Sequence, residues 1–227
     1  MHKYEVILRD LSNRIAGMEA GAKLPTEKEL AAQFGASTMT VRRALQIMID
    51  NGRLRGIPGR GTFIVQPRVT KTMSSASSFT DAMRAAGRLP GSRLLEATIR
   101  ESSDEEASWF RLPAGSPVYV ITRVRLGDDI PLAHETATLN ATLFPGLLGA
   151  NLELSLYDTL ESMYGIEVVR TGLVVAARLP GLEEARHLRI DRTVPCLETT
   201  VTSTDGSGTT VEHTRSLFRG DMYEVSL

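Results

Sequence analysis

Residues 24–65 read LPTEKELAAQFGASTMTVRRALQIMIDNGRLRGIPGRGTFIV. Thr26 followed three residues later by Glu29 is the pattern of a capping box, which marks the first turn of a helix. Gly35 then interrupts the helical pattern, and Ser37 is suited to cap another helix directly afterwards. The inner face of that next helix is expected to carry apolar residues at helical spacing: Val41, Leu45, Met48 and Ile49. We therefore predict two short helices joined by a tight turn, as in a helix-turn-helix, with Asn51-Gly52 ending the second.

The end of the same stretch predicts a β-hairpin. Two β-type segments, 53–55 and 62–65, flank the turn sequence Ile57-Pro58-Gly59-Arg60-Gly61. A glycine-rich loop can also cradle a nucleotide phosphate, but here no Lys-Ser/Thr pair follows and the chain continues into a strand instead of a helix. The hairpin is better interpreted as the wing of a winged helix-turn-helix, with Arg60 placed to enter a minor groove or hold a phosphate.

The outward face of the second of these helices favours contact with DNA. Its N-terminal end carries short polar side chains and then two cations: Thr38, Met39, Thr40, Arg42 and Arg43. The first turn of a recognition helix lies nearest the base edges of the major groove, and Arg42 or Arg43 has the length to reach a guanine or a phosphate. Residues 1–71 hold 12 Lys and Arg against 6 Asp and Glu, whereas the remainder holds 14 against 21. A basic face alone is usually only a solvated surface, but together with this motif it indicates a polyanionic partner.

Composition limits the other classes of function. A further helix is expected over residues 4–19, ended by Gly21. The single cysteine, Cys196, excludes an internal disulfide framework and favours a reducing cytoplasm. Neither an apolar run of membrane-spanning length nor the apolar core of a signal peptide is present, so no membrane partner is expected. With four histidines and one cysteine in the sequence, we expect no metal centre and no cofactor.

The rest of the chain predicts a second domain of the α+β class with a largely antiparallel sheet. Residues 66–77 (QPRVTKTMSSAS) are polar and read as an interdomain linker. Strands are expected over 93–100, 118–126, 131–138, 166–176, 197–204 and 209–217. Short helices are expected over 80–86, 104–111, 155–164 and 183–188.

An internal repeat connects the two halves of this second domain. EASWFRLPAGSP, from Glu106 to Pro117, aligns with EARHLRIDRTVP, from Glu184 to Pro195. The offset of about 78 residues is too long for a solenoid. We therefore expect two halves of one pseudo-symmetric sheet, in which each hairpin carries an acid on its second strand, Glu135 or Glu212.

Two arginines of the first half predict an anion site. Arg123 and Arg125 stand at i and i+2 of a strand and therefore project from one face. Two guanidiniums on one face make a strong clamp for phosphate or carboxylate, the alternative being surface or dimer-contact arginines. Helix starts at Ser78-Phe79-Thr80 and Ser155-Leu156-Tyr157 offer N–H groups and hydroxyls to the same anion, although each start alone is more simply a cap.

The N-terminal motifs resemble the GntR family of bacterial transcription regulators. LPTEKELAAQFGAS, TMTVRRAL and GRGTFIV look like that family's helix-turn-helix and wing, over about sixty residues. By position, the resemblance implies DNA contacts from Thr26, Glu27, Lys28, Thr40, Arg42 and Gly59 to Gly61. Many members carry Arg where this chain has Lys28, and often Arg where it has Thr38; Lys lacks the bidentate fork of Arg.

The C-terminal motifs resemble the UTRA effector-binding domain of the HutC subfamily within GntR. SFTDAM, ITRVRL, IPLAHETATL, LFPGLL, SLYDTLE and VEHTRSLFRGDMYEV occur in that order. The resemblance implies a fold similar to chorismate lyase and a division into a DNA-binding domain at 1–66, a linker at 67–77 and an effector-binding, dimerising domain at 78–227.

Sugar-phosphate-sensing members of that subfamily suggest which residues hold the ligand. The phosphate would meet Ser78, Phe79, Thr80, Arg123, Arg125, Ser155 and Tyr157. The rest of the ligand would meet Glu135, Arg170, Glu212 and Phe218, where Phe218 replaces the Tyr of many members.

The leading hypothesis is therefore a ligand-responsive transcription regulator, a homodimeric repressor that binds double-stranded operator DNA. A small anionic metabolite, with a phosphorylated sugar favoured, would modulate that binding. One alternative is a small lyase-like enzyme fused to a DNA-binding head, although no nucleophile–base set is visible. The other alternative is a DNA-binding protein whose C-terminal domain only dimerises.

Overall fold

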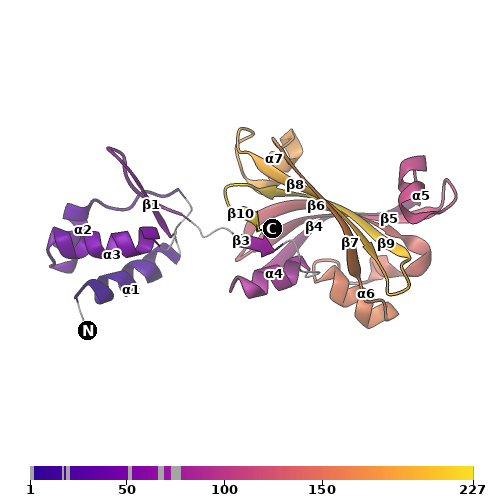
Figure 1. The fold of residues 1–227 in the computed structure, drawn as a ribbon, viewed down its shortest axis with the longest axis horizontal. Helices are drawn as coiled ribbons and strands as arrows, with labels where there is room; N and C mark the ends of the chain where they lie inside the picture. The colour runs from indigo at the N-terminus through magenta and orange to yellow at the C-terminus, as the bar shows by residue number, and fades with distance from the viewer. Residues whose placement is uncertain are drawn as a thin grey trace. The chain divides into compact units, whose positions relative to one another are not determined.

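The computed structural model describes residues 3–16, 18, 21–50, 53–65, 69–72 and 78–226. The chain divides into two compact units, Met1–Pro67 and Arg68–Leu227, whose elements are labelled in Figure 1. Each unit has hydrophobic clusters of its own, and each is described separately below. Within the described residues, no helix is long and apolar enough to cross a membrane.

The first unit is a three-helix bundle followed by a hairpin. It consists of α1 (Lys3–Ala16), α2 (Glu27–Phe34), α3 (Thr38–Asp50), β1 (Leu54–Ile57) and β2 (Gly61–Ile64). The predicted capping box is confirmed: the Glu29 N–H donates to Thr26 Oγ1 at 3.3 Å, and the Thr26 N–H donates to Glu29 Oε2 at 2.7 Å. Gly35 ends α2 in the left-handed conformation at φ 54°. The predicted end of α3, Asn51-Gly52, lies outside the described residues.

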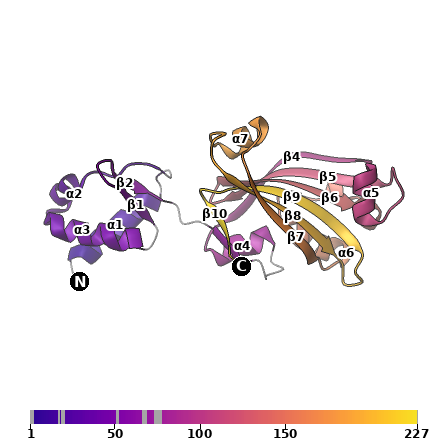
Figure 2. The same ribbon diagram turned by 45° about the horizontal axis from the view of Figure 1, so that its top comes forward.

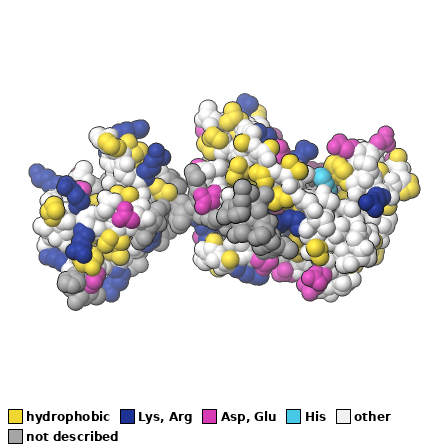
Figure 3. Space-filling view, viewed as in Figure 1, with side chains coloured by type: hydrophobic (Ala, Val, Ile, Leu, Met, Phe, Trp, Pro, Cys, Tyr) yellow, Lys and Arg dark blue, Asp and Glu magenta, His cyan; other side chains and the backbone are white. Residues whose placement is uncertain are grey.

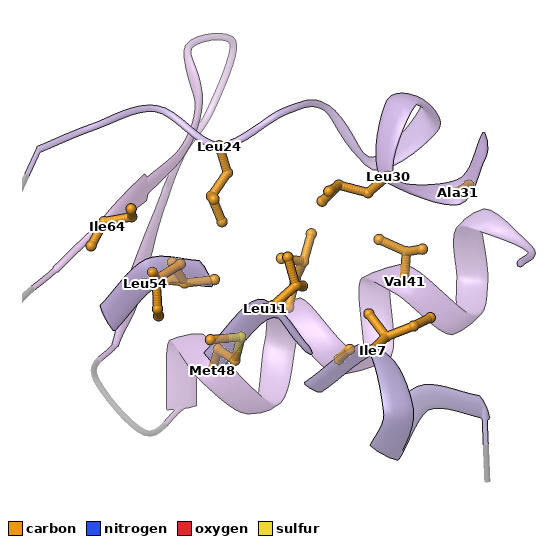
Figure 4. Packing of buried hydrophobic residues seen from close by; sticks show 12 residues of the cluster. Ile7, Leu11, Leu24, Leu30, Ala31, Val41, Met48, Leu54 and Ile64 are labelled. Atoms are coloured by element: carbon orange, nitrogen blue, oxygen red, sulfur yellow. The ribbon is translucent and has the colours of Figure 1, made fainter. Parts of the chain in front are cut away.

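One hydrophobic cluster joins all these elements (Figure 4). The predicted inner face of α3 is buried at Val41, Leu45 and Met48, whereas Ile49 is half-buried at the edge. These side chains meet α1, α2 and both strands of the hairpin through Ile7, Leu11, Leu30, Leu54 and Ile64. The hairpin is therefore fixed to the helices by apolar packing.

The second unit is built on a six-stranded antiparallel sheet in the order β4-β5-β6-β9-β8-β7, so the predicted α+β class is confirmed. The strands are β4 (Pro90–Glu101), β5 (Pro117–Gly127), β6 (Ile130–Asn140), β7 (Val169–Arg178), β8 (Cys196–Thr204) and β9 (Thr210–Arg219). The β5–β6 turn uses Asp128 and Asp129 at positive φ, which acids adopt more readily than most residues.

Four helices and two 3₁₀ turns cover the sheet. They are α4 (Phe79–Ala85), α5 (Asp104–Phe110), α6 (Leu156–Tyr164), α7 (Leu182–Leu188), η1 (Ala141–Leu143) and η2 (Leu147–Gly149). In both ribbon views α7 lies on the opposite side of the sheet from α4 and α6 (Figures 1 and 2). We call the side that carries α4 and α6 the α4/α6 face, and the side that carries α5 and α7 the α5/α7 face.

A short parallel pair of strands corrects the predicted linker over 67–77. Val69–Thr72 forms β3 and pairs with β10 (Tyr223–Ser226). The Val69 side chain is fully buried beside Met222 and Tyr223. This pairing joins two segments at opposite ends of the unit, so the local sequence gives no sign of it. The other residues of the predicted linker, 67–68 and 73–77, lie outside the described residues.

The predicted pseudo-symmetry is present in the sheet order. The unit β4-α5-β5-β6 is repeated as β7-α7-β8-β9, and the two copies meet where β6 pairs with β9 at Thr136 and Arg215. The ion pair Arg100–Glu106 of the first copy recurs as Arg178–Glu184 in the second. The helix of each copy also contacts a strand of the other copy: Trp109 of α5 stacks on His213 of β9, and His187 of α7 stacks on His134 of β6.

Each hairpin carries an acid on its second strand, as predicted, but the two acids differ in register. Glu135 lies opposite Arg123 in the β5–β6 register, whereas Glu212 lies opposite Ser203 in the β8–β9 register. Residue 201, the counterpart of Arg123, faces Thr214 instead. The two hairpin turns differ in length, and this shifts the second strand of each copy by a different amount.

Close backbone packing at Gly220 gives a first prediction. An added Cβ at Gly220 would lie 2.4 Å from the backbone oxygen of Pro195, which already accepts the Gly220 N–H. We expect Gly220→Ala to lower the free energy of unfolding of the second unit by about 1–3 kcal/mol, because backbone atoms have to move. The single tryptophan, Trp109, belongs to this unit, so urea unfolding followed by its fluorescence gives the measurement. Gly206→Ala, where nothing lies within 4 Å, is the control and should change little.

The repeated ion pair predicts a dependence of stability on pH. Hydrogen bonds from Arg178 hold the pKa of Glu184 at about 2, so its stabilising contribution is complete above the unfolded pKa near 4.5 and is lost as the pH falls toward 2. We expect Glu184→Gln to cost about 1–3 kcal/mol at pH 7, and the difference from the wild type to shrink between pH 5 and pH 2. Unfolding curves at several pH values test this. Glu183→Gln, whose carboxylate is exposed beside Arg186, is the matched control, and an equal effect there would contradict the assignment.

Candidate nucleic-acid interface and ligand pocket

The first turn of α3 and the start of α2 form one exposed polar surface. Thr38, Lys28, Arg42 and Arg43 are exposed, and Thr40 is half-buried with its hydroxyl 2.8 Å from Ser37 Oγ. Thr26 is committed to its capping box, because its hydroxyl donates to Glu29 Oε2 at 2.8 Å. Lys and Arg side chains are spread over the visible face of this unit (Figure 3).

Three of the predicted charged contacts of this surface, Glu27, Arg42 and Arg43, have different surroundings. Arg42 Nε donates to Glu27 Oε1 and Oε2 at 3.1 and 3.0 Å, and Arg42 Nη2 donates to Oε2 at 2.7 Å. This contact lowers the pKa of Glu27. Arg43 instead lies over the ring of Tyr4 on α1, with 4.2 Å from Cζ to the ring centroid. Of the two arginines, Arg42 therefore belongs to the α2–α3 surface and Arg43 packs toward α1.

The wing residues lie at the tip of the β1–β2 hairpin. Gly59 and Gly61 adopt positive φ values of 72° and 117°, which only glycine adopts readily, and Arg60 between them is exposed. The chain before α2 supports the hairpin, because the Leu24 N–H donates to Thr62 O at 2.9 Å. The loop therefore presents Arg60 on a short, anchored hairpin, separate from the Glu27–Arg42 contact.

A pocket on the α4/α6 face of the sheet collects residues that are far apart in the sequence. Every predicted effector residue except Thr80 lines it: Ser78, Phe79, Arg123, Arg125, Glu135, Ser155, Tyr157, Arg170, Glu212 and Phe218. Sequence reasoning missed Leu156, Thr199, Val201, Thr214 and Ser216, although alternation along β9 between Glu212 and Phe218 points to Thr214 and Ser216. Its cavity volume is about 60 Å³.

A larger cavity of about 380 Å³ adjoins this pocket and shares Arg125 and Ser155 with it. Thr80 lines this second cavity, together with Ser92, Glu153 and Asp158. Apolar clusters close the face at both ends, one around Tyr119, Ile121 and Leu160 and the other around Phe79, Met83 and Phe218. The polar side chains are thus held in a strip between two parts of the core.

Arg123 is bound on every side by the protein. Its side chain is 2% exposed and donates from Nε and Nη2 to Glu135 Oε1, at 3.2 and 2.5 Å. Its Nη1 donates to the backbone oxygens of Leu152 and Leu154, at 3.0 and 3.3 Å. Arg123 therefore ties β5 to β6 and to the loop before α6, a role that the sequence did not indicate.

Arg125 has fewer partners. Nη1 lies 3.3 Å from Glu135 Oε1, and the guanidinium stacks on Phe79 with 4.5 Å from Cζ to the ring centroid. Among the described residues, its buried Nε has no hydrogen-bond acceptor. Burial lowers the pKa of Arg125 to about 10, which leaves it protonated at neutral pH. Arg125 is therefore a buried cation with a donor available to an anion.

Glu212 is held by three hydroxyl groups. It accepts hydrogen bonds from Tyr157 at 2.8 Å, Ser203 at 3.2 Å and Thr214 at 2.7 Å. Burial raises the pKa of Glu212 and also that of Tyr157. The two predicted serines act as helix caps, since the Asp81 N–H donates to Ser78 Oγ and the Asp158 N–H donates to Ser155 Oγ.

The side chains that line the pocket include more cationic than acidic groups. Its lining contains three arginines, Arg123, Arg125 and Arg170, against the two acids Glu135 and Glu212. Such a site suits one small anionic group. In the part of the chain that the structure describes, no three His, Cys, Asp or Glu side chains are grouped as metal ligands. A separate cavity of about 280 Å³ lies on the α5/α7 face, between Trp109 and Arg178.

Known proteins share both units. Residues 3–64 match the family described as bacterial regulatory proteins, gntR family, and residues 85–224 match the UTRA domain. The chain is 35% identical to the HTH-type transcriptional repressor NagR of Bacillus subtilis, over 97% of this chain and 91% of NagR. It is 33% identical to the HTH-type transcriptional repressor PhnF of Mycolicibacterium smegmatis, over 96% of this chain and 89% of PhnF.

A solved structure has the same fold. The crystal structure of PhnF from Mycobacterium smegmatis superposes with a TM-score of 0.76 at 30% identity, covering 97% of this chain and 98% of that one. The mannosyl-D-glycerate transport/metabolism system repressor MngR of Escherichia coli is more distant, at 26% identity over 99% of this chain and 96% of MngR.

The different surroundings of Arg123 and Arg125 predict different effects on stability. Arg123→Met leaves Glu135 and two carbonyls without their main donor, so we expect the second unit to lose about 3–5 kcal/mol. Arg125→Met leaves the Arg123–Glu135 pair intact and should cost about 1–2 kcal/mol or less. Urea unfolding monitored through Trp109 compares the two.

The variant Arg123→Lys serves as the control and should recover part of the loss, because it keeps a cation next to Glu135. Equal losses for Arg123→Met and Arg125→Met would contradict the structural role of Arg123.

Proposed function

This chain belongs to the gntR family of bacterial regulatory proteins and carries a UTRA domain, and on that premise we propose that it is a repressor controlled by a small anion. It is a helix-turn-helix transcription regulator with an effector domain. We propose that α3 reads the major groove while the wing, through Arg60, contacts the adjacent backbone or minor groove. Acting on bacterial DNA, it would work in the cytoplasm.

We propose a homodimer as the DNA-binding form. A single helix-turn-helix gives modest affinity, whereas two copies bind half-sites about 34–36 Å apart and gain operator specificity. Regulation then follows if the ligand changes the relative placement of the two heads, and the coupling between ligand and DNA must be reciprocal.

The single observation that carries the ligand proposal is Arg125, a buried cation with an Nε that has no acceptor among the described residues. It lies between the 60 Å³ pocket and the 380 Å³ cavity, since it lines both. The smaller space suits one phosphate or carboxylate group, and the larger suits a polar body of sugar size. Thr80, outside the smaller pocket, would then meet that body. The name of the relative MngR refers to mannosyl-D-glycerate, a sugar derivative with a carboxylate.

An enzymatic role is less well supported. Glu135 is fixed by Arg123, and Glu212 is fixed by three hydroxyl groups, so neither acid is placed as a free general acid or base. Tyr157 donates its hydroxyl to Glu212, and the raised pKa of Tyr157 opposes its use as a nucleophile. These contacts suit a site that binds a ligand and releases it without chemical change.

The test measures DNA binding and its response to ligand with the full chain. Wild-type protein should bind DNA from upstream of its own gene, with an affinity that falls steeply between about 50 and 200 mM salt. Phosphorylated and unphosphorylated sugars are then screened for a change in that affinity. Arg125→Ala should keep operator binding but need an effector concentration raised by about tenfold or more, since a charge-assisted hydrogen bond is lost.

Arg215→Ala supplies the matched control, because it removes an exposed arginine on the α5/α7 face. It should respond to effector as the wild type does. An unchanged response of Arg125→Ala would refute the ligand site, and the absence of salt-sensitive DNA binding by the wild type would refute the regulator.

A further inference from the structure

Arg42 is held by an acid that comes from a different helix. Glu27 is the first residue of α2 and Arg42 lies in the second turn of α3, fifteen residues further along the chain. Three hydrogen bonds of 2.7–3.1 Å join the two side chains. The Arg42 side chain is nevertheless 61% exposed. An exposed ion pair of this kind contributes little to folding stability, but it does restrict where the Arg42 side chain lies.

The edge of the guanidinium that Glu27 uses is the informative detail. Glu27 accepts from Nε and from Nη2, which together form the side edge of the group. Among the described residues, Nη1 makes no hydrogen bond, and Nη2 keeps a second hydrogen. The end fork, made by one N–H of Nη1 and one of Nη2, therefore stays exposed. That fork matches the O6 and N7 acceptors of guanine in the major groove.

Glu27 itself is poorly suited to contact DNA. Both carboxylate oxygens are engaged with Arg42, and the contact lowers the pKa of Glu27, which keeps it ionised. An ionised carboxylate next to a phosphate backbone is repelled. The DNA contact that the family resemblance implies for Glu27 is thus better explained as an effect transmitted through Arg42.

We propose that Glu27 is a positioning residue for sequence readout: it fixes Arg42 with its end fork toward a guanine and weakens binding to DNA that lacks that guanine. This inference rests on the proposed DNA-binding function. A free arginine has many rotamers and satisfies any phosphate within reach, whereas a fixed one loses less freedom on meeting one base edge. The charge of Glu27 also cancels part of the attraction of Arg42 for phosphates, which carry no sequence information.

The neighbouring cations support a special role for Arg42. Arg43 is drawn onto the ring of Tyr4, and Lys28 has no planar fork for bidentate readout. Among the described residues 26–43, Arg42 is therefore the one cation that an acid holds in place while the end fork of its guanidinium stays exposed.

The experiment compares operator DNA with scrambled DNA of equal length, using the full chain at several salt concentrations. Glu27→Gln should bind scrambled DNA about twofold to fivefold more tightly, because a negative charge near phosphates is removed. It should bind the operator no better than the wild type does, so the specificity ratio falls by at least about twofold to fivefold. The salt dependence on scrambled DNA should become steeper.

Two further variants isolate the cause. Asp50→Asn removes one exposed acid from the far end of α3, where Asp50 is bonded to Gln46, and should change both affinities together with the ratio preserved. Arg42→Lys keeps the charge but loses the fork, so this variant alone should lower the specificity ratio. In the Arg42→Lys background, adding Glu27→Gln should not lower the ratio further.

The inference would be overturned if Glu27→Gln had the same specificity ratio as Asp50→Asn. It would also be overturned if Glu27→Gln lowered the ratio as much in the Arg42→Lys background as in the wild type. Either result leaves the proposed function standing, provided that the wild type still binds its operator in a salt-sensitive way.

Discussion

The buried ion pair between Arg123 and Glu135 organises the pocket on the α4/α6 face. Two charges in the interior of a sheet are tolerated only if they satisfy each other and their remaining hydrogen-bonding groups. Arg123 meets this requirement with Glu135 on β6 and with the carbonyls of Leu152 and Leu154 before α6. One side chain thereby fixes two strands and the approach to Ser155. Because Glu135 is bound mainly by Arg123, the Nε of Arg125 keeps a donor that no acceptor meets among the described residues.

The same ion-pair chemistry has another effect in the first unit. Arg42 and Glu27 are exposed, so water screens their attraction and the pair adds little to stability. Its contribution is geometric, because it restricts one flexible side chain on the α2–α3 surface. In the second unit the Arg123–Glu135 pair is almost fully buried, so removal of one partner would leave the other charge without water to solvate it. Burial therefore decides whether an arginine–glutamate contact supports the fold or shapes recognition.

Local signals in the sequence were sufficient for much of this structure. Thr26 with Glu29 places a helix start correctly, because a cap depends on residues three positions apart. The inner face of α3 follows from the helical spacing of its apolar residues. Pairing between distant segments was not predictable: β3 and β10 stand at opposite ends of the second unit, and no local pattern links them. The sequence grouped Arg123 with Arg125, but their different roles depend on the Leu152 and Leu154 carbonyls, whose position no local pattern encodes.

The duplicated arrangement of the sheet has a consequence for how such proteins diversify. Both halves share the arginine–glutamate pair and the crossed aromatic stacking on the α5/α7 face, while their opposite surfaces differ. One half supplies Arg123, Arg125 and Glu135 from β5 and β6, and the other supplies Arg170 from β7 and hydroxyl groups and Glu212 from β8 and β9. Ancestral gene duplication would explain this division, with one surface retained as scaffold. Descendant lineages are then free to acquire new chemical preferences by substitution in either half, without rebuilding the architecture that both inherited.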